Sequence, residues 1–346
     1  MHSKRTLIVS LGSIGMRHLQ VIRSVTPHAK IMVLRHTPVA ESAELADFTT
    51  SALSDVQAFQ PEVAVLANPT SLHAVMAQRL LAMGCHLLIE KPLASNAADG
   101  QAIYAAAQAK GCTVQIGYNL RYLPSLQLFR DQIHQGCVGR VLSIRCEVGQ
   151  HLESWRADTD YRQGVSARCE LGGGVLLELS HELDYLSWVF GRIDWVSAWL
   201  GKQSELEIDV EDLAHLVLGF QSTGVLPPVA SVSLDCIRQD TTRRCVAIGE
   251  KGSLIWDSVK GTVEACLRGG IDWQLLHQSD PERDFSYTAQ WQGFLDAVSG
   301  GNGQPDPMAA DLEQALHVLE VVEAARNSFT QNGVRLSLPV EDQCGR

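Results

Sequence analysis

The sequence predicts an α/β protein in which an N-terminal doubly wound parallel sheet is followed by an α+β domain with an open, mainly antiparallel sheet. Its length of 346 residues is enough for two domains with separate apolar cores. Up to Tyr122, short β-branched runs alternate with longer helical patterns, whereas later strand-like segments follow one another with short connections. We therefore predict domains at 1–122 and 123–346.

The elements of the first domain predict right-handed crossovers and a ligand site beyond the carboxyl ends of the strands. The expected strands are Thr6–Val9, Lys30–Leu34, Val63–Leu66, His86–Ile89 and Thr113–Ile116. The expected helices are Ile14–Val25, Ser71–Met83 and Ala97–Lys110.

The second domain mixes helices with strands that are joined by short loops. The expected helices are Ser125–Gln135, Gly174–Val189, Tyr287–Val298 and Asp311–Ser328. The expected strands are Val141–Val148, Val196–Leu200, Ala214–Phe220, Ala230–Ile237, Arg244–Ile248 and Ser253–Trp256. An open sheet needs its outer face covered, so we expect a homodimer or homotetramer formed through that face.

Charge and composition limit the partners. The chain has 28 basic and 39 acidic residues, a net charge of −11, which argues against nucleic acid or an anionic membrane as the main partner. No apolar run reaches the roughly 18 residues that a membrane span needs, and no export signal is evident. Nine cysteines without a Cys-x-x-Cys pair fit reduced thiols in the cytoplasm, and we expect no metal site.

The segment Ser10-Leu11-Gly12-Ser13-Ile14-Gly15 joins an apolar strand to a helix. In that context its amides and the helix dipole can face a pyrophosphate. Gly12 would permit close backbone approach and Gly15 close packing of helix on strand, while Ser10 stands where a first glycine is usual. The alternative is an ordinary strand-to-helix turn.

The end of the second strand bears on the choice of dinucleotide. Proteins that prefer NAD usually place a carboxylate there for the ribose 2′-hydroxyl, but this strand ends in Arg35 and His36. An arginine can pair with a 2′-phosphate or stack on adenine. We therefore predict NAD(P) as the cofactor with NADP(H) favoured, against the alternative of a surface arginine without a ligand.

Taken together, the motifs resemble those of the Gfo/Idh/MocA oxidoreductases, the family of glucose-fructose oxidoreductase and inositol dehydrogenase. The resemblance covers nearly the whole chain. It consists of Gly12 to His18, Asn68-Pro69-Thr70 with His73, Glu90-Lys91-Pro92, Gly117-Tyr118-Asn119 with Arg121, Gly172-Gly173-Gly174, and His181 with Asp184. It implies an N-terminal Rossmann domain and a C-terminal α/β domain whose open sheet commonly forms a subunit interface.

The resemblance implies a role for Lys91 at the reactive end of the nicotinamide, with Glu90 positioning it. Oxidation of a secondary alcohol removes a hydride and a proton, so a nearby cation and a base are needed independently of the family. The alternative for Lys91 is a solvated lysine at a strand end. The resemblance also places Asn68, Pro69, Thr70, His73 and Asn119 along the cofactor cleft, although His73 could equally make local hydrogen bonds.

His181 is the candidate base, because an imidazole titrates near neutral pH. Many family members carry an aspartate four residues before this histidine, whereas Leu177 stands there in this chain. On a continuous helix Glu178 would flank His181 and could substitute for that aspartate. Asp184 could orient the ring or a substrate hydroxyl, or pair with a basic neighbour.

The stretch Gln150–Arg168 is rich in aromatic and basic residues, among them Trp155 and Arg162. Such a loop suits a sugar that carries a carboxylate or phosphate, and a solvated crossover loop is the equally weighted alternative. By resemblance Tyr118, Arg121 and His181 line the substrate side together with this loop.

These observations favour an NAD(P)-dependent oxidoreductase that transfers a hydride between the nicotinamide and a secondary hydroxyl or carbonyl of a sugar, sugar derivative or cyclic polyol. One alternative is a sensor or regulator that binds the dinucleotide without chemistry, which the altered Ser10 and the missing aspartate allow. Another is reduction of an imine or a non-sugar carbonyl. Retention of Lys91 and His181 weighs against the sensor.

Overall fold

The computed structural model describes residues 4–36, 44–155, 160–221, 226–279, 284–300 and 306–339. The chain forms two compact units. Unit 1 consists of Met1–Tyr122 and Arg283–Leu319, and unit 2 consists of Leu123–Glu282 and Glu320–Arg346. The break after Tyr122 coincides with the predicted one. The segment 283–319 does not, because it groups with the N-terminal unit.

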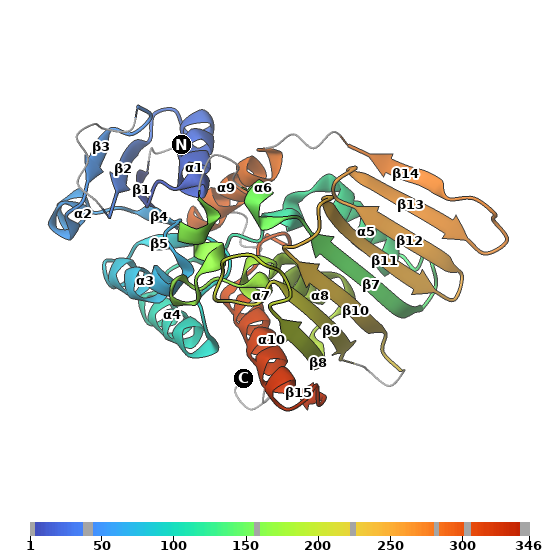
Figure 1. Cartoon of the computed structure of the whole chain (residues 1–346). Coiled ribbons are helices and arrows are strands. Elements are labelled where there is room, and N and C mark those ends of the chain that lie inside the picture. Colours follow the sequence, from blue (N-terminus) through green and yellow to red (C-terminus); the bar gives the residue numbers. More distant parts are fainter. Residues whose placement is uncertain are drawn as a thin grey trace. The chain divides into compact units, whose positions relative to one another are not determined.

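Unit 1 contains a six-stranded parallel sheet in the order β3-β2-β1-β4-β5-β6, as predicted for its fold class (Figure 1). The strands are β1 (Arg5–Val9), β2 (Lys30–Leu34), β3 (Phe48–Thr50), β4 (Val63–Leu66), β5 (His86–Ile89) and β6 (Val114–Ile116). Leu7, Ile8 and Val9 of β1 are all buried, because a central parallel strand is covered on both faces. β3 was not predicted, because it has only three residues and none of them is buried.

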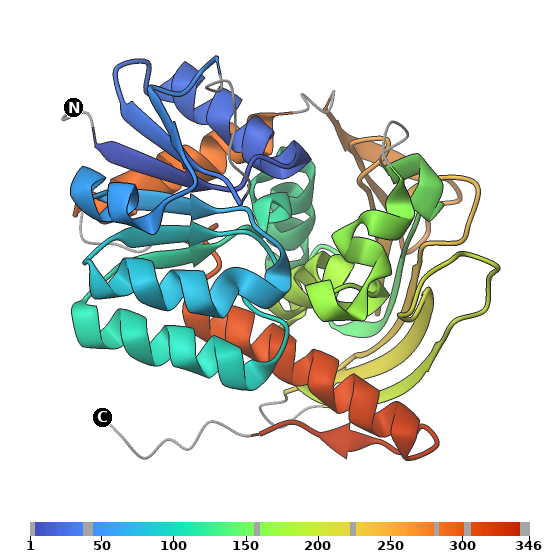
Figure 2. The same ribbon diagram turned by 60° about the vertical axis from the view of Figure 1, so that its left-hand side comes forward.

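The helices of unit 1 lie on both faces of this sheet. They are α1 (Ser13–Val25), α2 (Leu53–Phe59), α3 (His73–Ala82), α4 (Ala97–Lys110), α9 (Phe285–Val298) and the first part of α10 (Leu312–Thr330). In Figure 2, α1 and α9 lie together on one face while α3 and α4 pack against each other on the other. Helix α4 has strong end signals: Asn96 caps its first turn by accepting the Asp99 N–H, and Gly111 ends it at φ +62°.

The return of 283–319 to unit 1 has a hydrophobic cause. Trp291 and Phe294 of α9 are fully buried in one core cluster with Ile8 of β1 and Leu19 of α1. Their burial completes a face of the parallel sheet on which α1 also packs. The prediction of one domain over 123–346 overlooked this because chain order alone does not reveal a late helix packing on an early sheet.

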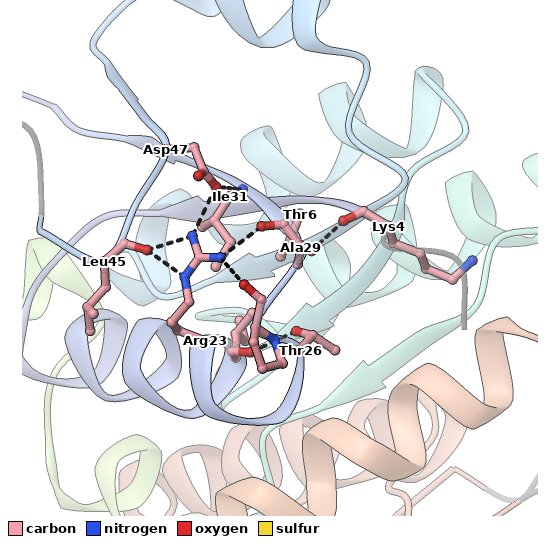
Figure 3. Close-up of polar contacts among 10 residues, drawn as sticks. Lys4, Thr6, Arg23, Thr26, Ala29, Ile31, Leu45 and Asp47 are labelled. Carbon is pink, nitrogen blue, oxygen red and sulfur yellow. Dashed lines mark hydrogen bonds and ion pairs between the residues drawn. The ribbon is translucent and has the colours of Figure 1, made fainter.

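A polar cluster fixes the end of α1 to the strands beside it (Figure 3). The Arg23 guanidinium donates to the carbonyls of Leu45 and Ala29 and pairs with the Asp47 carboxylate at 2.9 Å. The same carboxylate accepts the N–H of Ile31 on β2. The cluster therefore holds α1, β2 and the segment before β3 in one arrangement.

Unit 2 is built on a nine-stranded sheet in the order β14-β13-β12-β11-β7-β10-β9-β8-β15. All neighbouring strands are antiparallel except β7 and β10, which agrees with the predicted mainly antiparallel sheet. The strands are β7 (Val141–Gly149), β8 (Ile193–Gly201), β9 (Leu213–Phe220), β10 (Val229–Asp235), β11 (Thr242–Gly249), β12 (Gly252–Asp257), β13 (Thr262–Leu267), β14 (Gln274–Gln278) and β15 (Leu336–Ser337).

One face of this sheet packs against helices and the other bears exposed apolar side chains. Its helices are α5 (Pro124–His134), α6 (Leu152–Trp155), α7 (Val175–Glu178) and α8 (His181–Phe190). Tyr185 of α8 and Trp256 of β12 meet edge to face in the core. On the other face Trp199 and Val217 remain 42% and 41% exposed. This exposed face leaves room for the predicted subunit contact, which stays a prediction.

Candidate active site

The predicted cofactor residues of unit 1 follow adjacent strands at one edge of the parallel sheet. The strand ends are in register, with Val9 paired to Leu34 and Leu66, and Ile89 paired to Leu66 and Ile116. Ser10, Arg35, Asn68, Lys91 and Gly117 come directly or one residue after these ends. Chain order reverses between β1 and β4, so this edge includes the position where doubly wound sheets bind ligands.

The loop after β1 has the backbone conformation that the motif requires. Ser10 adopts φ +77°, the left-handed region that favours glycine. A Cβ at Gly15 would clash with the Ser10 carbonyl, whereas a Cβ at Gly12 would meet nothing within 4 Å. Gly15 is therefore needed for packing of α1 on β1, and Gly12 leaves open space beside the loop.

This loop opens α1 without a side-chain cap. Gly12 is the N-cap residue, and Met16 donates the first helical hydrogen bond to its carbonyl. The first amides of the helix, at Ser13, Ile14 and Gly15, thus precede the helical bonding pattern and retain donors for an anion. An uncapped helix start beside an open glycine fits a pyrophosphate, so the residues present suit a dinucleotide.

Arg35 lies next to this loop. The Ser10 N–H donates to Leu34, and the Arg35 N–H donates to Thr50, so the backbone on both sides is fixed. The Arg35 side chain is half-buried and His36 is exposed. This position beside the phosphate loop suits contact with the adenosine part of a dinucleotide.

The backbone of Lys91 is held by its neighbour Glu90, which in turn contacts α1. The Lys91-Pro92 peptide is cis, and the Lys91 N–H donates to Glu90 Oε2 at 3.3 Å. Glu90 Oε1 lies 2.6 Å from Nε2 of His18, a fully buried residue of α1. The sequence analysis included His18 in the motif but gave it no role in the site. No local signal reveals the pair, because the two residues are 72 positions apart.

His73 makes the local hydrogen bonds that were its alternative interpretation. Its Nε2 lies 3.0 Å from the Asn68 carbonyl and its Nδ1 lies 3.0 Å from the Pro92 carbonyl. Burial lowers the pKa of the ring, which favours the neutral form. His73 therefore ties the loop after β4 to the loop after β5, and its contact with a cofactor stays a prediction.

The other residues after β4 flank this support. Pro69 precedes the short helix η1 (Thr70–Leu72), and Thr70 is buried. Asn68 is half-buried, and its Oδ1 is enclosed with no hydrogen-bond partner among the described residues. A buried amide oxygen at the ligand edge is available to a donor from a bound molecule.

The segment after β6 turns inward. Tyr118 and Arg121 are each 1% exposed. Arg121 donates to Gln314 Oε1 at 2.7 Å, and Asn119 donates to the Ser286 hydroxyl at 2.8 Å. These side chains bind α9 and α10 within unit 1. In this structure the three side chains have packing and hydrogen-bonding roles in the core, and the ligand roles of Tyr118, Asn119 and Arg121 stay predictions.

The predicted helix 174–189 is two helices. α7 ends at Glu178 and α8 begins at His181, with Leu179 and Ser180 between them. The premise that Glu178 flanks His181 on one continuous helix is therefore wrong. The run of apolar residues through Leu179 concealed the break, because it continues the helical pattern.

His181 is half-buried at the first position of α8. Asp184 is 1% exposed, and Glu182 is fully buried in a 2.9 Å ion pair with Arg243 of β11. The Glu182–Arg243 pair fixes the first turn of α8 to the sheet. Glu178 remains half-buried at the end of α7. The proton-transfer roles of His181, Glu178 and Asp184 stay predictions.

Arg162 lies at a surface hollow of about 650 Å³ formed by two loops of unit 2. Its guanidinium pairs with Asp160 and Glu207, each at 2.8 Å. Trp155 is half-buried and donates its indole N–H to the Gln150 carbonyl. Two carboxylates already neutralise Arg162, so a substrate anion would have to displace one of them.

The described residues contain no group of three or more His, Cys, Asp or Glu side chains placed to hold a metal ion. No helix in the described part of the chain is long and apolar enough to cross a membrane.

Comparison with known proteins places this geometry in context. Residues 4–118 match the model of the oxidoreductase family, NAD-binding Rossmann fold, and residues 130–338 match that of its C-terminal alpha/beta domain. A levoglucosan dehydrogenase from Pseudarthrobacter phenanthrenivorans is 32% identical, over 39% of this chain and 34% of its own length. A D-xylose dehydrogenase from Paenarthrobacter nicotinovorans is 27% identical over 76% of this chain and 75% of its own.

Solved structures show the same fold. The WlbA dehydrogenase from Bordetella pertussis, in complex with NADH and UDP-GlcNAcA, matches with a TM-score of 0.80. The match covers 98% of this chain and 100% of that one at 24% identity. At this identity the likeness establishes a shared fold and no shared substrate.

Proposed function

Because the chain belongs to the Gfo/Idh/MocA oxidoreductase family, we propose that it transfers a hydride between a nicotinamide dinucleotide and a secondary hydroxyl or carbonyl of a sugar, sugar derivative or cyclic polyol. The supporting observation is the shared edge of the parallel sheet, where the phosphate loop and Lys91 follow β1 and β5. The names of the levoglucosan and D-xylose dehydrogenases support a carbohydrate substrate.

In the proposed reaction this chain's residues handle the proton. A bound dinucleotide supplies or accepts the hydride. Gly12, Ser13 and Ile14 would bind its pyrophosphate through backbone amides. Lys91 stabilises negative charge on the reacting oxygen, and His181 accepts the hydroxyl proton during oxidation. Glu178 or Asp184 orients His181 or a substrate hydroxyl.

The preference for NADP(H) is part of the proposal. Arg35 follows β2 next to the phosphate loop, at the position where a carboxylate selects NAD in many dinucleotide-binding proteins. The 2′-phosphate of NADP would supply the partner that a guanidinium binds most strongly. The proposal also includes a homodimer or homotetramer through the exposed sheet face of unit 2, where Trp199 and Val217 lie.

The experiment combines ligand binding with turnover. The purified chain is heated with NAD, NADH, NADP or NADPH, and saturation at about 100 times the dissociation constant should stabilise it by about 2.7 kcal/mol. A panel of aldoses, sugar acids and cyclic polyols is then screened by nicotinamide absorbance. Binding with turnover supports the enzyme. Binding without turnover on the whole panel favours the sensor, and absence of binding by all four dinucleotides overturns the proposal.

A further inference from the structure

The pair His18 and Glu90 joins two parts of unit 1 that the proposed function uses separately. His18 lies on α1, which begins at the phosphate loop, and Glu90 precedes Lys91. The His18 Nε2 and Glu90 Oε1 atoms are 2.6 Å apart, a short hydrogen bond. His18 is fully buried and Glu90 is 8% exposed, so water does not compete for this contact.

The second ring nitrogen of His18 makes no hydrogen bond in the described part of the chain that would compete with the bond to Glu90. Nδ1 of His18 is enclosed and has no hydrogen-bond partner among the described residues. The edge of the ring instead packs against Tyr287 of α9, with centroids 5.6 Å apart at 84°. Burial of an imidazole with one nitrogen unsatisfied is unfavourable in itself, so the polar function of this side chain rests on its bond to Glu90.

Glu90 is restrained on its other sides as well. Oε2 accepts the backbone N–H of Lys91, and Gly117 packs against the same residue. A Cβ at Gly117 would lie 3.0 Å from Glu90 Oε2 and 3.1 Å from its Cα. One carboxylate oxygen thus binds α1 while the other binds the backbone of Lys91, so loss of the first contact frees the carboxylate next to the lysine.

We propose that His18 is a positioning residue for the reaction: through its bond to Glu90 it fixes the carboxylate that holds the backbone from which Lys91 extends. The inference rests on the proposed function of Lys91. Without His18, the Glu90 carboxylate loses one of its two contacts, so the Lys91 backbone that it holds and the amine that extends from it are displaced. Because α1 carries both His18 and the phosphate loop, the same helix positions the dinucleotide seat and Lys91.

The test compares three variants. His18→Asn shortens the side chain so that it no longer reaches Glu90, while His18→Gln keeps an amide donor near the Nε2 position. Leu19→Ala, a cavity variant at the next buried position of α1, controls for loss of stability. We expect His18→Asn to lower kcat by about 10- to 100-fold, the scale of a small displacement of a positioned group. His18→Gln should recover most of it.

The accompanying parameters separate positioning from loss of folding. The dissociation constant for the dinucleotide should change by less than about 3-fold in His18→Asn. Leu19→Ala should unfold at a lower temperature but keep its kcat. If His18→Asn keeps the wild-type kcat, or if Leu19→Ala loses kcat to the same extent, the inference is overturned.

A second measurement does not depend on turnover. Trace acetylation followed by peptide mass spectrometry gives the reactivity of the Lys91 amine relative to the exposed helix-end Lys110. We expect the rate at which Lys91 reacts to change by at least about 3-fold in His18→Asn, because displacement of its backbone changes the surroundings of the amine. An unchanged rate refutes the inference. Wild-type protein without turnover on any substrate would instead refute the proposed function, while the acetylation comparison remains decisive for His18.

Discussion

The carbonyl oxygen of Ser10 occupies the space that a Cβ at residue 15 would need. The obstacle is backbone, so a larger residue must move β1 or the start of α1. Gly15→Ala should therefore destabilise the protein by about 1–3 kcal/mol and weaken dinucleotide binding. Urea unfolding and an NADPH titration measure the two effects. Wild-type stability in this variant would show that the loop relaxes without cost.

Gly12→Ala is the matched comparison for that variant. A Cβ at residue 12 would meet nothing within 4 Å, and the φ of −65° there suits alanine. The free energy of unfolding should therefore change by less than about 0.5 kcal/mol. The open space is where the proposed pyrophosphate approaches, so affinity should fall about 10-fold or more while stability is kept. Unchanged affinity would place the phosphates elsewhere.

Ser10 itself carries backbone strain. At φ +77° an L-residue costs about 1–2 kcal/mol; glycine removes this strain, but its greater freedom in the unfolded chain cancels part of the gain. Ser10→Gly should thus raise the free energy of unfolding by about 0.5–1 kcal/mol. Gln60→Gly, at φ 51° and remote from the ligand edge, should stabilise similarly without altering dinucleotide affinity. A destabilised Ser10→Gly would indicate a role for the serine hydroxyl.

Arg35 gives the most direct test of cofactor choice. Arg35→Asp replaces a cation by an anion beside the phosphate loop, so it should repel a 2′-phosphate and accept a ribose hydroxyl. The ratio of NADPH to NADH affinity, measured by calorimetry, should fall by about 10-fold or more and reverse any preference for NADPH. Unchanged relative affinities would show that Arg35 does not contact the 2′ position.

Lys91 and His181 should separate chemistry from binding. Lys91→Ala and His181→Ala are each expected to reduce kcat by about 100-fold or more, the scale of a lost acid–base group. Dinucleotide affinity should remain near the wild-type value. Lys110→Ala, at the exposed end of α4, controls for removal of a positive charge. Near-normal turnover in either variant would remove that residue from the mechanism.

Asp47 predicts a dependence of stability on pH. Partial burial raises the pKa of this carboxyl, but hydrogen bonds from Ile31 and Arg23 outweigh it and hold the pKa below 3.8. A carboxyl with a lowered pKa stabilises the fold at pH values above its unfolded-state pKa. This stabilisation is lost as the pH falls through the folded-state pKa. The free energy of unfolding of the wild type should exceed that of Asp47→Asn by about 0.5 kcal/mol at pH 6, a small difference because the Arg23–Asp47 pair is partly exposed. The difference should be smaller at pH 3. Urea midpoints at both pH values measure this difference, and an equal difference at both would contradict the assignment.

The buried strands of unit 1 were predictable because burial on both faces demands continuous β-branched runs. β2, β4 and β5 begin and end where the sequence pattern predicts. β14 was missed because it is an edge strand whose Leu275 and Leu276 are exposed and give no alternating apolar signal. β13 was missed too, although its Val263 and Ala265 are buried. Local pattern thus identifies strands that the core requires more readily than those at the margin.

The candidate site was predictable in its outline but not in its side-chain directions. The strand ends place Ser10 and Lys91 at one edge, and this follows from parallel pairing alone. Whether a polar residue faces the ligand or the core depends on distant partners, as Arg121 binding to Gln314 shows. The same reason explains why His18 was not recognised as the partner of Glu90.

The burial of Trp291 and Phe294 in the core with Ile8 and Leu19 has a consequence for biosynthesis. During translation the first 122 residues leave the ribosome long before α9 exists, so the apolar face that α1 and α9 share lacks the cover of α9 while most of the chain is made. A cloned fragment that ends at Tyr122 should be prone to aggregation for the same reason. Unit 1 can therefore complete its core only after the ribosome has added Phe294.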